Sequence, residues 1–491
     1  MTINHLMLIM TTRRRPASRI PSLTFLALGA MALSACDSKQ LGITNPNAPT
    51  VAAAASDPQA LQLLATGLLR QLRNGRGGFI ISTGIFGREL FNYTPQEPRN
   101  TSNFLIGISG QNKLDPNGFA TGNWGIQYGN LRDIFNFKNL ITGSATLSAE
   151  QKKAALGFDG TLEALELLYV ISTRDTLGAV VEIKQNASDL APFVSRDSVY
   201  KYILNTLDAA NDNLAAGGSA FPITLHSGFA GFNTPTTFRT FNRAIAAKAA
   251  AYYATAGGGA TAWQRSLAAN TASFVNTGAT TRAAFDAGPF HPYGASPDVN
   301  NPANGTTSTD LFAHPSTLTD VPKKADGTLD SRYVAKVVTK AERQPPGGFG
   351  IPSSLGYIVY TGISSPIPII RNEELILLRA EALLGTGDKA GAITLINSIR
   401  VNSGGLSLST LTASSSDDAV ITELLLQKRY SLLLEGNRWI DARRYGKLST
   451  LPLDIATGPN AHFVPKVQPV PAGECLVRNG KATAVLGPGC Q

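Results

Sequence analysis

The segment from Gln427 to Gly446, QKRYSLLLEGNRWIDARRYG, constrains the fold most, because it joins an apolar helical stretch to a dense set of charges. Three consecutive leucines, Leu432–Leu434, predict a helix packed into the core. Arg438 and Asp441 are three residues apart, so they can pair on one helical turn with Trp439 covering them from water. We interpret the segment as a structural charge network, and the functional alternative is a basic anion site. The predicted network comprises Arg429, Glu435, Arg438, Asp441 and Arg444.

Residues 1–35 have the pattern of a lipoprotein signal peptide. Four arginines between residues 13 and 19 precede a short apolar run from Leu23 to Leu33, which is too short to form a stable membrane-spanning anchor. The following Leu33-Ser34-Ala35-Cys36 resembles a bacterial lipobox. This resemblance predicts cleavage before Cys36 and lipidation of that residue, and the alternative is an ordinary secretory signal with a chance cysteine.

Acyl chains on Cys36 would hold the mature chain at a membrane surface, since each buried methylene contributes about 0.8 kcal/mol. No apolar run of about 18 residues follows, so we expect an anchored protein that does not span the membrane. Residues 1–35 contain four arginines and no acidic side chain, so their removal lowers the formal net charge from +9 to +5. This small excess argues against nucleic-acid binding. Translation from Met1 or Met10 fits this organisation, as does twin-arginine export.

Two further cysteines, Cys475 and Cys490, lie near the carboxyl end. An exported chain matures in an oxidising compartment, so we expect a disulfide that closes this short loop and stabilises it by about 3 kcal/mol. The alternative is a pair of free thiols in a frayed tail. A metal site is not expected, because no other cysteine and no closely spaced histidine pair accompanies them.

The mature chain reads as an extended tether at residues 36–56 followed by a single mainly helical domain at residues 57–491. A first helix over Asp57–Leu72 is predicted with Ser56 as its cap. Later helices pair along the chain, and the clearest pair joins Glu373–Leu384 to Asp388–Arg400 through a tight turn with an Asp N-cap. The other predicted pairs are Gly122–Leu140 with Ala149–Ser172, and Asp197–Leu214 with Thr240–Thr255. The small residues at these helix contacts follow a pattern similar to that of tetratricopeptide helix hairpins, with a degenerate repeat.

Two long polar stretches, residues 74–120 and 257–360, are expected as loops. Loops of this length in a compact domain are usually functional or disordered, and scattered aromatic residues favour order. Sugars and other polar organic ligands are held by aromatic faces together with hydrogen-bonding groups, so we expect the binding site here. The alternative is packing of these aromatics onto the helices. The candidate ligand-binding residues are Phe91, Tyr93, Phe104, Phe290 and Tyr293.

Catalytic motifs are missing from the sequence. It contains no HExxH, GxSxG or P-loop, and the carboxylates Glu163 and Glu166 read as structural groups on one helical face. A glycosidase needs two acids across a cleft, and sequence alone leaves open a pair among Asp286, Asp298 and Asp310. We therefore expect no enzyme, no metal and no cofactor.

Four motifs in the same order along the chain resemble the SusD/RagB family. In the Gln427–Gly446 segment, Gln427 and Ser431 replace two family glutamates and Ala442 replaces a leucine. Arg371–Leu384 resembles the family's RxAExxLxxAEA helix, Pro469–Glu474 its terminal PIPxxE, and Trp124–Asn139 more loosely its WxxxYxxIxxxN helix. The positions of the late motif that match are Arg429, Leu432, Glu435, Gly436, Arg438, Asp441, Arg444 and Gly446.

The resemblance implies a mainly all-α fold in which tetratricopeptide-like helix pairs support a loop-rich ligand-binding face. It also implies a lipoprotein of the outer membrane, facing the cell exterior, that captures oligosaccharides or peptides and passes them to a TonB-dependent barrel without covalent chemistry. The family's ligand residues lie in divergent loops, so none is transferred to this chain. A lipid-anchored hydrolase and a tetratricopeptide-type protein scaffold are the alternatives.

Overall fold

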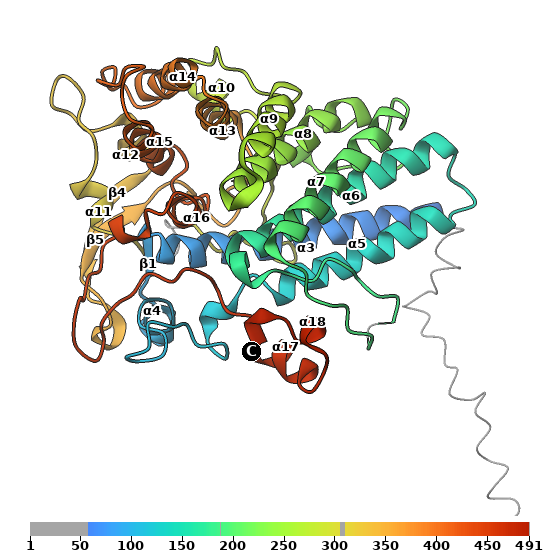
Figure 1. Cartoon of the computed structure of the whole chain (residues 1–491), viewed down its shortest axis with the longest axis horizontal. Coiled ribbons are helices and arrows are strands. Elements are labelled where there is room, and N and C mark those ends of the chain that lie inside the picture. The colour runs from blue at the N-terminus through green and yellow to red at the C-terminus, as the bar shows by residue number, and fades with distance from the viewer. Residues whose placement is uncertain (1–56, 187, 305–309, 491) are drawn as a thin grey trace, which may run out of the picture. The chain divides into compact units, whose positions relative to one another are not determined.

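Helices dominate the computed structural model, which describes residues 57–186, 188–304 and 310–490 (Figure 1). The described residues belong to one compact unit. The predicted signal peptide, the tether and the lipidation site Cys36 lie outside the described residues. No helix in the described part of the chain has both the length and the apolar character needed to cross a membrane.

The first helix, α3 (Pro58–Phe86), is longer than the sequence predicts. The side chain of Asp57 caps it by accepting from the Gln59 amide at 2.8 Å, whereas the predicted cap Ser56 is outside the described residues. The helix continues through glycines that suggest a break after Leu72. At Gly77 a Cβ would lie 2.0 Å from Cγ of Pro302, so this glycine permits close packing inside a helix. The expected loop at 74–120 therefore begins at the end of α3.

The predicted helix pairs are present, and each packs against the next. Helix α6 begins with a capping box in which Ser148 accepts from the Gln151 amide and Gln151 accepts from the Ser148 amide. The turn before α14 contains Gly387 at φ +93°, and Asp388 caps the helix as predicted, accepting from the Gly391 amide at 2.8 Å. The paired helices are α5 (Gly125–Gly143), α6 (Ala149–Arg174), α7 (Arg196–Ala215), α8 (Pro235–Tyr253), α9 (Gly259–Thr271), α13 (Asn372–Gly385) and α14 (Lys389–Asn402).

Within the described ranges, three small antiparallel sheets connect the remaining segments. Strand β1 (Leu90–Asn92) pairs with β3 (Leu311–Ala313), and β2 (Phe290–His291) pairs with β6 (Ile367–Pro368). Strand β4 (Val337–Arg343) pairs with β5 (Ser353–Tyr357). The stretches expected as loops, 74–120 and 257–360, therefore contain ordered helices and strands, and the strands β1, β2 and β3 pair with strands far away in the sequence.

Short helices complete the domain. Figure 1 shows α11, α12 and α15 near the strands β4 and β5, while α6 to α9 lie together in another part of the domain. The short helices and the late helices are α4 (Arg99–Leu105), α10 (Arg282–Asp286), α11 (Ser316–Thr319), α12 (Ser331–Val334), α15 (Asp417–Ser431), α16 (Arg438–Arg444), α17 (Ala472–Arg478) and α18 (Thr483–Leu486).

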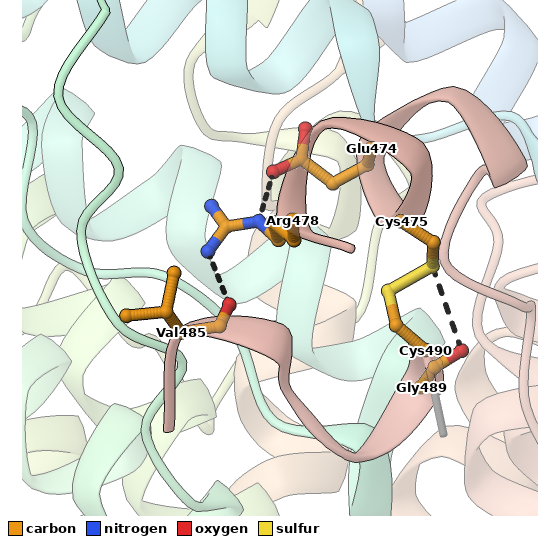
Figure 2. The surroundings of a disulfide bond; sticks show 6 residues. All are labelled: Glu474, Cys475, Arg478, Val485, Gly489 and Cys490. Carbon is orange, nitrogen blue, oxygen red and sulfur yellow. Dashed lines mark hydrogen bonds and ion pairs between the residues drawn. A yellow bond between two sulfur atoms is a disulfide. The ribbon is translucent and has the colours of Figure 1, made fainter. Parts of the chain in front are cut away.

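The carboxyl-terminal region is closed by a disulfide between Cys475 and Cys490, the pairing that the sequence predicts (Figure 2). Arg478 pairs with Glu474 at 2.7 Å and donates to the Val485 carbonyl at 2.6 Å. The same guanidinium lies 4.8 Å from the ring centroid of Phe193. The contact with Phe193 joins this region to the rest of the domain.

Candidate functional site

Four of the five candidate aromatics lie in the core. Phe91 and Tyr93 on and beside β1 stack at 4.9 Å and are at most 1% exposed. Phe104 packs against Phe86 at 5.6 Å. The Tyr293 hydroxyl donates to the Arg73 carbonyl at 3.0 Å. The ligand-facing role expected for these four side chains is thus corrected: the alternative of loop packing describes them, because the small sheets fold the connections onto the helices.

Phe290, the fifth candidate, lines a cavity of about 640 Å³. The pairing of β2 with β6 places it opposite Pro368, which lines the same cavity. Tyr360 and Ile358 extend the apolar wall. The remaining lining residues are Arg282, Asp286, Gly288, Ser331, Arg332, Ala335, Lys336, Val359, Pro366, Arg371, Ser403 and Glu435.

The mouth of this cavity carries an exposed ion pair. Arg282 holds Asp286 with two hydrogen bonds of 2.8 Å, from Nε and Nη2, and both side chains are about half exposed. Arg282 also reaches the buried Glu373 at 2.7 Å, so its guanidinium is fixed in orientation. A fixed guanidinium and carboxylate offer donors and acceptors to a polar ligand.

Deeper in the cavity the charged side chains already have partners within the fold. Arg371 contacts Glu435 at 2.8 Å and also pairs with Glu373. Burial acts to lower the pKa of Arg371, but Glu435 and Glu373 outweigh it and the pKa is raised well above its usual value. Lys336 donates to the carbonyls of Tyr430 and Ser431, and burial followed by repulsion from Arg371 lowers its pKa to about 8. The charged floor is thus part of the fold.

The predicted charge network exists with different partners. Asp441 pairs with Arg444 at 2.7 Å and with Lys428 at 2.8 Å, and both cations also contact Glu381. Burial acts to raise the pKa of Glu381, but Arg444 and Lys428 outweigh it and lower the pKa to about 2. Two buried cations and two buried anions therefore satisfy one another.

The expected pair of Arg438 with Asp441 is wrong. Arg438 instead donates from Nη1 to the Arg88 carbonyl at 2.7 Å, because α16 begins at Arg438 and turns Asp441 toward α13 and α15. Arg429 pairs outside the network, with Asp320 at 2.7 Å. Reasoning from the sequence does not identify Glu381 and Arg371 as partners of the late motif. Both lie in the Arg371–Leu384 motif, and the occurrence of the two motifs together is the signal that could have indicated the contact.

The candidate acids contact basic or polar side chains and are not paired with one another. Each loop acid has an arginine of its own: Asp286 with Arg282, Asp298 with Arg73 at 3.0 Å, and Asp310 with Arg343 at 2.6 Å. Glu163 accepts from the Tyr202 hydroxyl at 2.5 Å. Glu166 accepts from Asn130 at 3.1 Å, and burial raises its pKa to about 8. Among the described residues, no group of three or more His, Cys, Asp or Glu side chains is placed to hold a metal.

Comparison with known proteins tests the resemblance to the SusD/RagB family. Residues 354–469, which include α13 to α16 and the charge network, match the SusD family. The resemblance to the SusD family is confirmed. No curated protein sequence is similar to the chain.

Solved SusD-like structures extend the likeness to the fold of most of the chain. A SusD superfamily protein from Bacteroides vulgatus aligns with a TM-score of 0.64 at 15% identity, covering 86% of this chain and 97% of that one. NanU from B. fragilis aligns at 0.66 and 13% identity, covering 91% and 99%. Surface glycan-binding protein A from Bacteroides fluxus aligns at 0.64 and 13% identity, covering 87% and 98%. The SusD-like, mainly helical fold is thereby established.

Proposed function

We propose that this SusD-like chain is a nutrient-binding lipoprotein of the outer membrane, anchored through Cys36, which captures oligosaccharides at the cell surface. It passes them to a TonB-dependent barrel for import. The observation that carries the proposal is the cavity of about 640 Å³ beside Phe290, set in a fold shared with a surface glycan-binding protein.

The chemistry of the cavity suits a sugar. Its volume lies within the range of about 300–1,000 Å³ that is typical of sites for small organic ligands. Phe290 and Pro368 supply an apolar wall, and Arg282 and Asp286 supply oriented polar groups at the mouth. An aromatic face with hydrogen-bonding groups beside it is the combination that a pyranose ring requires, because the ring is apolar on its faces and polar at its edge.

The pairing of the carboxylate at the cavity mouth supports capture of the ligand without chemical conversion. Glycoside hydrolysis needs two carboxylates held across a scissile bond, one of them free to donate a proton. Asp286, at the cavity mouth, is instead held by both nitrogens of the Arg282 fork.

Calorimetric titration with ligands selected on a glycan and peptide array tests the cavity. Phe290→Ala should weaken glycan binding about tenfold, which corresponds to about 1.4 kcal/mol of lost stacking and burial. Asp286→Asn should weaken it through lost acceptor strength. The matched control is Phe119→Ala, which removes a 44% exposed phenylalanine from outside the cavity lining. Unchanged affinity in Phe290→Ala would show that the glycan does not bind in this cavity. Binding of peptides alone would show that the ligand is a peptide and not a glycan.

Two further measurements separate the alternatives. Release of reducing ends or peptides from the bound ligand would indicate a hydrolase. Complete protection from protease added to intact cells would contradict a surface location and favour a periplasmic scaffold. Co-purification with a barrel protein tests the transport partner.

A further inference from the structure

A second cavity, of about 330 Å³, opens between α15 and α16 and shares no lining residue with the cavity at Phe290. Its apolar lining residues are Leu425, Leu426, Ala442 and Leu451. Its charged lining residues are Asp320, Lys428, Arg429, Arg438, Asp441 and Lys447.

Arg438 is the cation of this cavity whose charge is least compensated. Lys428 contacts Glu381 and Asp441, Arg429 contacts Asp320, and Lys447 contacts Asp418. Within the described residues, Arg438 makes no ion pair, and its hydrogen bond goes to the neutral Arg88 carbonyl. Burial and then the positive charge of Arg429 lower the pKa of Arg438 to about 9.

Glu89 is the acid that most offsets the charge of Arg438, and it does so incompletely. Neither of its carboxylate oxygens has a hydrogen-bond partner. Burial raises the pKa of Glu89 to about 7, although Arg438 opposes this shift. Near neutral pH a fraction of Glu89 is therefore protonated, and in those molecules the charge of Arg438 is offset less, with Asp320 as the remaining acid that acts on it.

Asn437 provides a second unused donor at the cavity wall. Its Oδ1 accepts from Lys248 at 3.1 Å and from the Tyr252 hydroxyl at 3.3 Å, which fixes the amide with Nδ2 as its remaining donor. Nδ2 is buried and has no partner. Leaving a buried donor without an acceptor is unfavourable, so an acceptor that reaches Nδ2 would form a hydrogen bond that this donor does not yet make.

We propose that this cavity binds a carboxylate carried on an apolar group. The carboxylate pairs with the Arg438 guanidinium, which matches it in geometry, and the apolar group rests against Leu425 and Leu451. Two sources offer this chemistry: a free short-chain acid and the carboxyl terminus of a peptide that ends in an apolar residue. The site is independent of the proposed glycan cavity.

Calorimetry on the full mature chain with hexanoate and its neutral isostere hexanamide tests the charge requirement. Acetyl-Ala-Ala-Leu with a free or amidated carboxyl terminus tests the peptide source. We expect at least one free acid to bind at least tenfold more tightly than its amide. Binding of hexanoate identifies a small acid, and binding of the tripeptide alone identifies a chain terminus.

Variants locate the binding. Arg438→Gln should weaken binding of the acid at least tenfold, and Leu425→Trp should do the same by filling the cavity while leaving every charge in place. The matched control is Arg265→Gln, which removes a partly exposed arginine paired with Asp208 on another part of the fold. If Arg438→Gln does not fold, Leu425→Trp alone tests whether the acid binds in this cavity. Equal binding of acid and amide, no binding of either acid, or full binding in Leu425→Trp would overturn the proposal.

Discussion

Two buried carboxylates, Glu381 and Glu89, lie beside arginines and lysines of the same carboxyl-terminal segment, yet their surroundings differ sharply. Glu381 contacts Lys428, Arg444 and the Tyr445 hydroxyl, and its pKa is lowered to about 2. Glu89 contacts no hydrogen-bond donor with its carboxylate, and burial raises its pKa to about 7. Nearby positive charge alone does not stabilise a buried acid; direct hydrogen bonds from its partners decide the outcome.

This difference distinguishes a charge cluster that stabilises the fold from one that could bind a ligand. In the region around Glu381 two cations and two anions pair with one another, so although Lys428 and Asp441 line the cavity of about 330 Å³, their charges are already compensated. The region around Glu89 and Arg438 is incomplete and adjoins a cavity. The following predictions test whether that contrast holds, beginning with the largest expected effect.

Replacing Glu381 by alanine should destabilise the domain by about 3–5 kcal/mol, because Lys428 and Arg444 would be left buried with Asp441 as their single shared anion. Urea unfolding followed by circular dichroism measures the change. Glu163→Ala is the control, since Glu163 lies outside the network. A loss below about 1 kcal/mol would mean that the network is not the closed structure described above.

Acid should weaken the same region. Because the pKa of Glu381 is lowered from about 4.5 to about 2, its contribution is complete above pH 4.5 and is lost as the pH falls toward 2. The contribution is on the order of 3 kcal/mol. Unfolding free energies measured between pH 6 and pH 2.5 should fall more steeply in the parent chain than in Glu381→Gln. Parallel curves would contradict this prediction.

Glu89→Gln should have the opposite sign and stabilise the domain at pH 8 by about 2 kcal/mol. The folded pKa of Glu89 is raised, so the parent chain loses stability as the pH rises from 4.5 through 7. Glutamine cannot ionise and avoids that loss. Thermal unfolding at pH 8 and pH 4.5 measures the effect, and the gain should disappear at the lower pH. A destabilised variant at pH 8 would show that ionised Glu89 is needed as the partner of Arg438.

Arg438→Ala should cost the least, about 1 kcal/mol, which is the value of its hydrogen bond to the Arg88 carbonyl. From sequence alone, a larger loss through an orphaned Asp441 or Glu435 is expected. Both acids keep other partners in the structure, namely Lys428 and Arg371. Comparison with Arg444→Ala in the same urea titration is informative, because Arg444 does hold Asp441. Equal losses of unfolding free energy in Arg438→Ala and Arg444→Ala would support the pairing of Arg438 with Asp441 that is expected from the sequence.

Features that depend on neighbouring residues could be predicted from the sequence, and those that depend on distant partners could not. The hairpin of α13 and α14 follows from its turn, where Gly387 and Asp388 act locally. The end of α3 was missed because Gly77 is matched to Pro302, more than 200 residues away. Phe91 was misassigned for the same reason, since its burial follows from the pairing of β1 with β3.

The site shows the same division. The sequence identified which residues carry charge in the Gln427–Gly446 segment, but spacing alone suggested Arg438 as the partner of Asp441. The three-dimensional crossing of α13, α15 and α16 selects Lys428 and Arg444 instead. Of the loop aromatics, Phe290 lines a cavity together with Pro368, its partner across β2 and β6.

Helix α3 has a mechanical consequence. At 1.5 Å per residue its 29 residues extend about 43 Å. Along that length it packs on α5 and α16, and Arg76 donates to the Glu435 carbonyl at 3.0 Å. A pull on the chain ahead of Asp57 would load these contacts in shear, many at once, so that the domain resists tension at its amino-terminal end without peeling open one turn at a time.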